Sequence, residues 1–454
     1  MITIFLCFFS ATSILSQEIF PPFSRGKEEL RLPDQSPLVL FDVLNFISEE
    51  SGKSRLDIHY RISYDFFVFV KNIPFNASSP YIARTEIGVE ILDKNNMSVA
   101  REFVRKEIKL LESPSQTTKQ QFLEGMLSLN LPPGEYSLVT EVNDLESTRK
   151  YLDTKKKVTL KNFSNDSLEV SDILFLELLS RNDSTILTPI NHGGDVPFGR
   201  NFDGYFEVSL GNHSDDSLRI EYALTKYSSE RRSFNPVLGN EANVYSQDTS
   251  IRLEHIEDEF RYSAAGSYRK GKYGCWLHFR GDTLRLGDYE LEVKVYTPNF
   301  LKSEKRKFRI RWFDMPLSLR NLQFAIDALE YIAPDSILEQ LRKARGEKQQ
   351  QLFEEFWRQR DKTPTTTFNE VMEEYYRRVD YAYMNLNTIR ERNGAKTDRG
   401  KAYILYGPPA KIVREFAPSL PPKEIWYYPN LQKKLIFIDE SRKGEYKLLT
   451  TAEL

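Results

Sequence analysis

Apolar and polar residues alternate along much of the first two thirds of the chain. Between positions 56 and 64 an apolar side chain stands at every second residue, so these side chains share one face of an extended strand. A continuous apolar run at 66–70 also predicts a strand, and the strand expected at 85–92 ends in the turn-forming residues 93–96. Short strands separated by turn signals are typical of antiparallel β-sandwiches, which we predict for residues 37–315.

The pattern Gly-acidic-Tyr-x-Leu occurs at two widely separated places, 134–138 and 287–291, and each copy leads into another alternating segment. In both copies the glycine permits a turn, and the tyrosine begins a strand whose tyrosine, leucine and valine share one face. The spacing is much longer than a solenoid repeat, so it indicates tandem domains. We predict two related sandwiches, one at 37–162 and one at 163–315. A third, shorter copy stands at 444–448.

The segment that joins the two sandwiches is less clearly patterned. Residues 171–179 are apolar enough for either a helix or a buried strand, and their periodicity does not decide between the two. The stretch from there to 211 is rich in Asn, Asp, Gly and Pro and predicts loops. Within it we interpret His192 to Asp195 as a polar loop rather than a ligand site. The five histidines of the chain are scattered, and none has a metal-ligand spacing.

The hydrophobic period changes from two to about 3.6 after the second sandwich. Apolar residues line one helical face at 319–332, and an aromatic stripe at 352–357 is expected to pack into a core. Thr367 and Glu370 have the spacing of a capping box, and the apolar positions that follow are three or four residues apart. We therefore predict a helical segment at 316–392.

A polar turn and a short apolar run follow the helical segment. Gly394 and Gly400 permit backbone angles that other residues avoid. Thr397 and Asp398 are expected to bond amides in the turn, and Asp398 is expected to stabilise this module. The run 402–406 alternates and predicts a strand that is covered on both faces. A Gly-Pro-Pro sequence then ends that strand, because proline cannot donate to a sheet.

This turn resembles the signature of the GWxTD domain, a module of large secreted bacterial proteins whose role is not established. The signature stands at 394–398, with Ala395 in place of the tryptophan. The similarity includes the helical run before it and the closing strands after it, over about 317–450. It implies a GWxTD-like module at 393–454. The residues that the resemblance marks as structural or partner-binding are Gly394, Thr397, Asp398, Arg399, Gly400, Tyr406, Gly407, Pro408, Pro409, Glu424, Trp426 and Tyr427.

Together these patterns predict a multidomain fold that is mainly β with an α+β part. Two antiparallel, Ig-like sandwiches are followed by the helical segment and the small strand-rich module. A hydrophobic fraction of 40% is enough for packed cores. The 63 basic and 65 acidic residues give a net charge of −2, and this balance argues against nucleic acid as a partner.

Residues 1–16 have the apolar core and the small residues of a secretory signal, and 17–36 follow as an N-terminal arm. No later run is long and apolar enough to predict a membrane span. We expect an exported protein that is periplasmic, envelope-associated or extracellular. Loss of the signal would remove Cys7 and leave Cys275, which alone forms neither a disulfide nor a zinc site and is expected to be a buried thiol.

No motif for catalysis, cofactor binding or metal binding has the required spacing. The favoured hypothesis is a non-catalytic binding or structural protein whose partner is a protein or glycan of the cell envelope. The alternative is a secreted hydrolase of glycans, which needs only two carboxylates. Its site would lie in the C-terminal module, in a cleft lined by Asp398, Arg399, Glu424 and Trp426.

Overall fold

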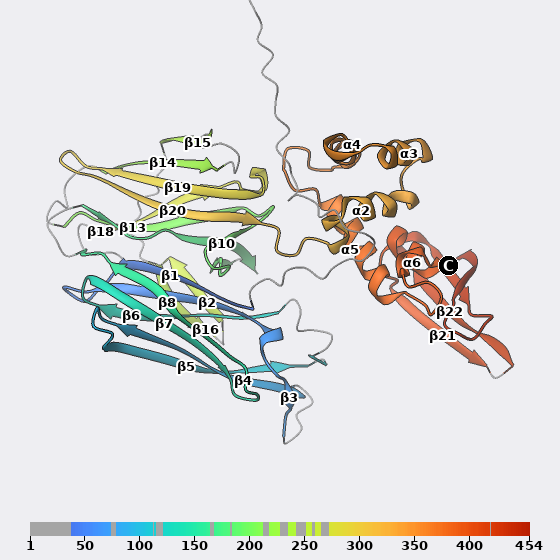
Figure 1. The fold of residues 1–454 in the computed structure, drawn as a ribbon, viewed down its shortest axis with the longest axis horizontal. Helices are drawn as coiled ribbons and strands as arrows, with labels where there is room; N and C mark the ends of the chain where they lie inside the picture. The colour runs from blue at the N-terminus through green and yellow to red at the C-terminus, as the bar shows by residue number, and fades with distance from the viewer. Residues whose placement is uncertain are drawn as a thin grey trace, which may run out of the picture. The chain divides into compact units, whose positions relative to one another are not determined.

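A computed structural model gives the fold of the chain (Figure 1). The predicted signal and arm lie outside the residues that it describes. Those residues divide into two compact units, which we call the two-sandwich unit, up to Phe313, and the C-terminal unit, Asp314–Leu454. Described are residues 38–454 except 74–78, 112, 115–120, 164–167, 182–183, 212–217, 228–234, 242–250, 257–258, 265–271 and 418.

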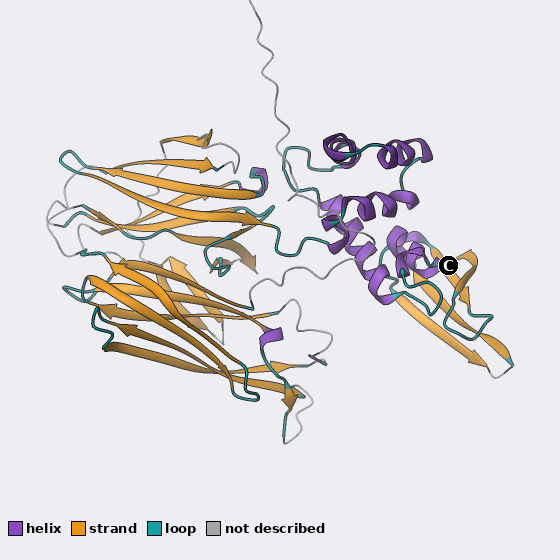
Figure 2. Cartoon of the chain, viewed as in Figure 1, coloured by secondary structure: helices purple, strands orange, loops and turns teal. Residues whose placement is uncertain are grey.

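Strands make up most of the described two-sandwich unit (Figure 2), as the alternating pattern predicts. In the first sandwich, one sheet has the order β1-β2-β6 and the other has the order β3-β4-β7-β8, with β5 paired to β4. All neighbouring strands run antiparallel. The strands are β1 (Val39–Ile47), β2 (Ser54–Ser63), β3 (Val70–Lys71), β4 (Tyr81–Leu92), β5 (Ser98–Leu110), β6 (Phe122–Leu131), β7 (Gly134–Asp144) and β8 (Lys150–Leu160).

One strand predicted in the first sandwich is wrong. The apolar run at 66–70 does not form a continuous strand. A 3₁₀ turn occupies Tyr64–Phe66, and only Val70 and Lys71 pair with β4. Phe66 and Phe67 are buried in the core of the sandwich. The hydrophobicity of this run therefore predicts its burial correctly but not its backbone conformation, because a buried turn and a buried strand can have the same composition.

The second sandwich has one sheet of order β16-β17-β11-β10-β13-β18, with β9 beside β13, and another of order β12-β20-β19-β14-β15. The open question at 171–179 is settled in favour of a strand, β10. The strands are β9 (Glu169–Val170), β10 (Leu174–Arg181), β11 (Ser184–Pro189), β12 (Val196–Pro197), β13 (Phe202–Ser209), β14 (Arg219–Lys226), β15 (Asn235–Glu241), β16 (Ile251–Ile256), β17 (Glu259–Ala264), β18 (Lys272–Phe279), β19 (Gly287–Tyr296) and β20 (Leu301–Arg311).

The repeated Gly-acidic-Tyr-x-Leu pattern occupies the same place in both sandwiches. It opens β7 in the first and β19 in the second. The Tyr136 hydroxyl donates to the carbonyl of Pro132 at 3.0 Å, and the Tyr289 hydroxyl donates to the carbonyl of Arg285 at 2.8 Å. Each tyrosine thus bonds the carbonyl four residues before it, as in the tyrosine corner of Ig-like sandwiches. The shared corner supports the interpretation of the two copies as related domains.

A buried polar contact joins the two sandwiches. Glu207 on β13 is fully buried, and its carboxylate accepts from the amide of Ile47 at 2.9 Å and from Arg55 at 3.3 Å. Asn45 and Asp172 add a pair of bonds, because each accepts from the amide of the other residue, at 2.8 and 3.0 Å. Leu44, Phe46, Leu174, Leu176 and Tyr205 pack beside these groups.

The C-terminal unit combines helices with one antiparallel sheet of order β21-β22-β23-β24. Its helices confirm the change to a period of 3.6. No helix in the described ranges is long and apolar enough to cross a membrane. The elements are α2 (Leu322–Ala328), α3 (Asp335–Lys343), α4 (Gly346–Arg358), α5 (Glu370–Asn385), α6 (Asp398–Tyr406), β21 (Lys411–Ala417), β22 (Leu420–Tyr428), β23 (Lys433–Ile438) and β24 (Lys447–Glu453).

Two local predictions in this unit are wrong. The run 402–406 is not a strand but the end of helix α6, which starts at Asp398. A five-residue apolar run fits both periods, and the Thr397 N-cap is the signal that distinguishes them. The N-cap of α5 is Asn369, whose side chain accepts from the amide of Met372 at 2.8 Å, and not Thr367. The predicted capping box is therefore wrong: the helix begins after Asn369, and its third residue, Met372, has no side-chain acceptor to complete a box.

Candidate functional site

The signature residues form a short connection between α5 and α6. Residues Gly394–Lys396 make one 3₁₀ turn, and the side chain of Asn393 accepts from the amide of Ala395 at 3.0 Å. The Thr397 hydroxyl then accepts from the amide of Gly400 at 3.0 Å and donates to the carbonyl of Gly394 at 2.8 Å. Thr397 is therefore the N-cap of α6 and also closes the turn before it.

Two glycines permit this connection to pack without space for a side chain. A Cβ atom on Gly400 would lie 1.9 Å from the carbonyl oxygen of Gly394. A Cβ atom on Gly394 would lie 2.1 Å from the carbonyl oxygen of Ala382 on α5. Both contacts are with backbone, which cannot rotate away as a side chain can. The turn, α5 and α6 thus meet backbone to backbone, and we call Gly394, Thr397 and Gly400 the clasp.

Ala395, at the position of the family's tryptophan, is buried at 5% exposure. Its carbonyl oxygen accepts from the hydroxyl of Tyr331 at 2.8 Å. This bond uses the backbone and not the side chain, so any residue at this position offers the same acceptor. The clasp consequently does not depend on an aromatic side chain at Ala395.

Asp398 lies at the surface and does not bond the amides of its own turn. Its carboxylate accepts from the amide of Leu448 at 2.8 Å and lies 3.8 Å from the ammonium of Lys447. The side chain is 36% exposed. Asp398 therefore connects the start of α6 to β24, and its negative charge suits the first turn of a helix.

Glu424 on β22 is the centre of the charged cluster in this unit. Its carboxylate accepts from Arg414 at 2.9 Å, from Arg399 at 3.2 Å and from the indole of Trp426 at 3.2 Å. Glu424 is 3% exposed and Trp426 is 2% exposed. The Arg399 guanidinium also lies 4.6 Å from the ring centre of Tyr446.

Burial alone would raise the pKa of Glu424, but the bonds from Arg414 and Arg399 outweigh it and lower the pKa below its ordinary value. A general acid needs a raised pKa and access to a substrate. Glu424 has neither, because its oxygens are bonded and its side chain is packed. The cluster is suited to connecting β22 to α6 and β21.

The remaining marked residues surround the end of α6. Gly407 has φ +79° and terminates the helix, and its carbonyl accepts from the hydroxyl of Tyr428 at 3.1 Å. The ring of Tyr406 lies 5.7 Å from that of Tyr428. Pro408 is exposed, whereas Pro409 and Tyr427 are half-buried. Tyr406 and Gly407 thus join the end of α6 to the sheet.

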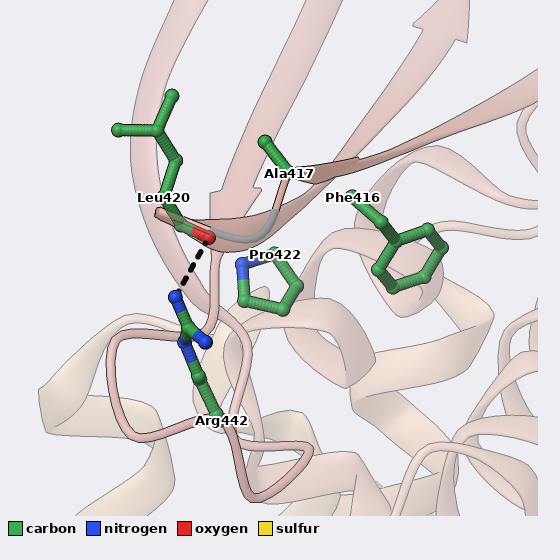
Figure 3. A pocket seen from close by; sticks show the side chains of 5 residues that line it. All are labelled: Phe416, Ala417, Leu420, Pro422 and Arg442. Atoms are coloured by element: carbon green, nitrogen blue, oxygen red, sulfur yellow. Dashed lines mark hydrogen bonds between the residues drawn. The ribbon is translucent and has the colours of Figure 1, made fainter.

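An open recess lies at the far end of the β21–β22 hairpin (Figure 3). Its volume is about 320 Å³. The guanidinium of Arg442 donates to the carbonyl of Leu420 at 3.3 Å and forms one wall. Phe416 is 71% exposed and Leu420 is 57% exposed. The lining is Phe416, Ala417, Leu420, Pro422 and Arg442, so the recess does not include Asp398, Arg399, Glu424 or Trp426.

The loop at His192 is part of the structure of the two-sandwich unit. The imidazole of His192 stacks on Phe313, with ring centres 4.2 Å apart, and contacts the guanidinium of Arg61. Burial and the charges of Arg61, Arg200 and Arg311 lower the pKa of His192 to about 3. Among the described residues, no group of three or more His, Cys, Asp or Glu is placed to hold a metal ion.

Sequence reasoning missed Arg414, Tyr446 and Tyr331 as members of this region. Arg414 lies opposite Glu424 across the β21–β22 pair, and that register cannot be read from one strand alone. The two-residue spacing of Glu424 and Trp426 does place them on one face of a strand. That spacing was the signal in the sequence for the charged cluster.

The family model of the GWxTD domain matches residues 302–450. The chain carries a GWxTD domain. The matched range begins within β20 and extends through the C-terminal unit to β24. A comparison with curated proteins finds no relative of the chain.

Several solved structures are similar to the chain at low identity. The C-terminal domain of the Streptococcus pyogenes antigen I/II-family protein AspA is 9% identical, with a TM-score of 0.17, and covers 60% of this chain and 99% of that one. An ICAM-5 D1-D4 ectodomain fragment is 8% identical, with a TM-score of 0.15, and the match covers 61% of this chain and 54% of that one. Escherichia coli alpha-2-macroglobulin activated by porcine elastase is 9% identical, with a TM-score of 0.15, over 60% and 23%. Scores at this level support no inference about function.

Proposed function

We propose that this GWxTD domain protein is an exported, non-catalytic binding and structural scaffold of the bacterial cell envelope. The observation that carries the proposal is the use of the signature residues in internal packing. Gly394, Thr397 and Gly400 make backbone contacts between α5 and α6. Glu424 is buried and bonded to two guanidinium groups. Residues used in this way hold a domain together and are not available to a substrate.

The two-sandwich unit supports a scaffold role. Its sandwiches share the buried contact around Glu207, which is 0% exposed. The two sandwiches are therefore expected to move as one rigid body rather than independently on a flexible linker. Such a body suits a spacer that presents a second module. The partner expected for the C-terminal unit is a protein or glycan of the envelope, and residues 1–16, with the pattern of a secretory signal, support export to that compartment.

A secreted hydrolase of glycans has less support. That mechanism needs two carboxyl groups beside one substrate, one of them with a raised pKa. The pKa of Glu424 is lowered instead, because Arg414 and Arg399 bond its carboxylate despite its burial. Asp398 bonds β24 at the surface. The recess at the hairpin contains neither carboxylate.

Two measurements on the purified full chain test the proposal. Co-sedimentation with isolated cell envelopes is expected to be saturable, and incubation with peptidoglycan and envelope polysaccharides is expected to release no reducing ends. Reducing ends released by the wild type but not by a folded Glu424→Gln variant would contradict the proposal. So would the absence of saturable binding, or recovery of the native protein in the cytoplasmic fraction of its host.

A further inference from the structure

The β21 strand forms an open edge of the sheet in the C-terminal unit. Among the described strands it pairs with β22 only. Six of its seven residues are exposed, and Val413 is half-buried. The opposite edge, β24, is different because Asp398 on α6 accepts from its Leu448 amide. An edge strand presents a row of N–H and C=O groups that can bond another strand, and β21 has no such cover among the described residues.

Two opposite charges flank the centre of this edge. Lys411 and Glu415 stand two residues before and two residues after Val413, so all three side chains lie on the same face of β21. Both charged residues are exposed. Neither forms an ion pair with another residue in the described part of the chain. Within the sheet, Glu415 faces Lys423 of β22.

This arrangement is complementary to itself. If a second β21 strand runs antiparallel about a two-fold axis at Val413, residues equally far from Val413 face each other. Lys411 of each copy then faces Glu415 of the other, so the pairing forms two opposite-charge contacts. Pairing about the next residue, Arg414, would instead place two guanidinium groups together. The charges therefore favour the register about Val413 over the register about Arg414.

The ends of β21 limit the length of such pairing. A bulge between Glu415 and Ala417 disturbs the register near the hairpin end, and Pro408 and Pro409 precede the strand. Proline cannot donate to a neighbouring strand. Pairing is thereby confined to about 411–415 and closes at two copies. The exposed ring of Phe416 would cover Ala410 of the second copy and add apolar contact.

We propose that β21 is a homodimer interface, which pairs with β21 of a second copy of this chain about Val413 and joins the two four-stranded sheets into one. The inference goes beyond the scaffold role, because it names a surface and its occupant. A five-residue strand pair buries less than the roughly 1,200 Å² of a stable interface. The dimer is therefore weak and reversible.

Sedimentation velocity of the full chain over a range of concentrations tests the interface. The wild type is expected to shift from monomer to dimer as its concentration rises. In K411E a carboxylate at position 411 of each copy faces Glu415 of the other, and the dimer is expected to weaken about tenfold. In E415K an ammonium group at position 415 faces Lys411 of the other copy, and the same weakening is expected. Thermal melting of both variants serves as the control for folding, because both positions are exposed.

Charge reversal gives the sharper test. The double variant K411E/E415K restores opposite charges in both pairs between the two copies and is expected to dimerise like the wild type. An equimolar mixture of K411E and E415K is expected to form a heterodimer at concentrations where each alone is monomeric. A wild type that stays monomeric at all concentrations would overturn the proposal. So would a dimer that K411E leaves unchanged, or a mixture that associates no better than its components.

Discussion

At the residue scale, the GWxTD signature is explained by backbone contacts rather than by reactive side chains. Gly394 and Gly400 have no room for a Cβ atom, and Thr397 uses both the donor and the acceptor capacity of its hydroxyl. The only signature position where this chain differs is Ala395, whose carbonyl makes the bond to Tyr331. The signature therefore specifies a way of joining two helices.

Gly400→Ala tests the close approach directly. The new methyl group would overlap the carbonyl oxygen of Gly394 at 1.9 Å, and relief requires movement of the backbone. We expect a loss of about 2–4 kcal/mol in the free energy of unfolding of the C-terminal unit, measured in urea. Lys396→Ala, at an exposed position of the same connection, is the matched control and should change it by less than about 0.5 kcal/mol. Equal effects of the two variants would refute the close contact.

Thr397→Val tests the hydroxyl at nearly constant volume. It removes the cap on the Gly400 amide and the bond to the Gly394 carbonyl, so we expect a loss of about 1–3 kcal/mol in the same unit. Thr397→Ser keeps the hydroxyl and should lose less. Asp398→Ala removes one bond to an exposed amide and should cost less than Thr397→Val. A larger loss of stability in Asp398→Ala than in Thr397→Val would show that Asp398 is the main stabilising residue of the turn, as the sequence alone suggests.

His192 should make the two-sandwich unit sensitive to acid. Burial and three nearby arginines hold the pKa of His192 at about 3 in the folded state, whereas an unfolded histidine titrates near 6.5. Between these values the unfolded state binds the extra proton, so folding stability is complete above pH 6.5 and falls with pH by up to about 1.4 kcal/mol per unit. In the wild type the urea midpoint of this unit should fall between pH 6.5 and pH 4. His192→Gln should make that fall smaller, when each midpoint is compared with the value at pH 8. An unchanged profile would contradict this assignment.

At the element scale, alternation in the sequence predicts the sandwiches well because most of their strands have one face in the core. Tyr289, Leu291 and Val293 occupy alternate positions in β19, and each is buried. The period of 3.6 likewise predicts α5. The sequence failed where an element is short, as in α6 and the 66–70 turn, because five residues fit more than one period. The capping residues distinguish the alternatives: Thr397 starts α6, and Ser63 starts the 3₁₀ turn at Tyr64–Phe66.

Side-chain contacts between elements that are distant in the chain could not be predicted from the sequence, for a physical reason. Glu207 accepts from Ile47, Arg55 and Tyr205, and two of these belong to the other sandwich. Nothing in the pattern of β13 distinguishes a carboxylate that faces a partner domain from one that faces water. The same holds for Glu424, whose two arginines come from α6 and β21. Such partners are determined by the fold and not by spacing in the chain.

Glu207→Ala tests the contact between the sandwiches. It leaves Arg55 and the Ile47 amide without their buried acceptor, so we expect a loss of about 3–5 kcal/mol from the two-sandwich unit. Glu207→Gln keeps an oxygen acceptor and should lose less. Glu102→Ala, at an exposed position on β5, is the control. Differential scanning calorimetry measures the shift, and a Glu207→Ala transition like that of Glu102→Ala would show that the contact is not stabilising.

At the scale of the whole molecule, the described residues form two compact units. The two-sandwich unit has two sandwiches that share buried polar contacts. The C-terminal unit carries the GWxTD domain signature and the open β21 edge. We expect two calorimetric transitions, because each unit has its own core. Glu207→Ala should shift one of them and Gly400→Ala the other.

The central claim is that the GWxTD signature is a structural clasp between α5 and α6. Hydrogen exchange of the full chain, followed by mass spectrometry of its peptides, tests it most directly with wild type and Thr397→Val. We predict faster exchange of the amides between 386 and 406 in the variant and unchanged exchange in the two-sandwich unit. Unchanged protection of 386–406, or an equal loss across the whole chain, would contradict the claim.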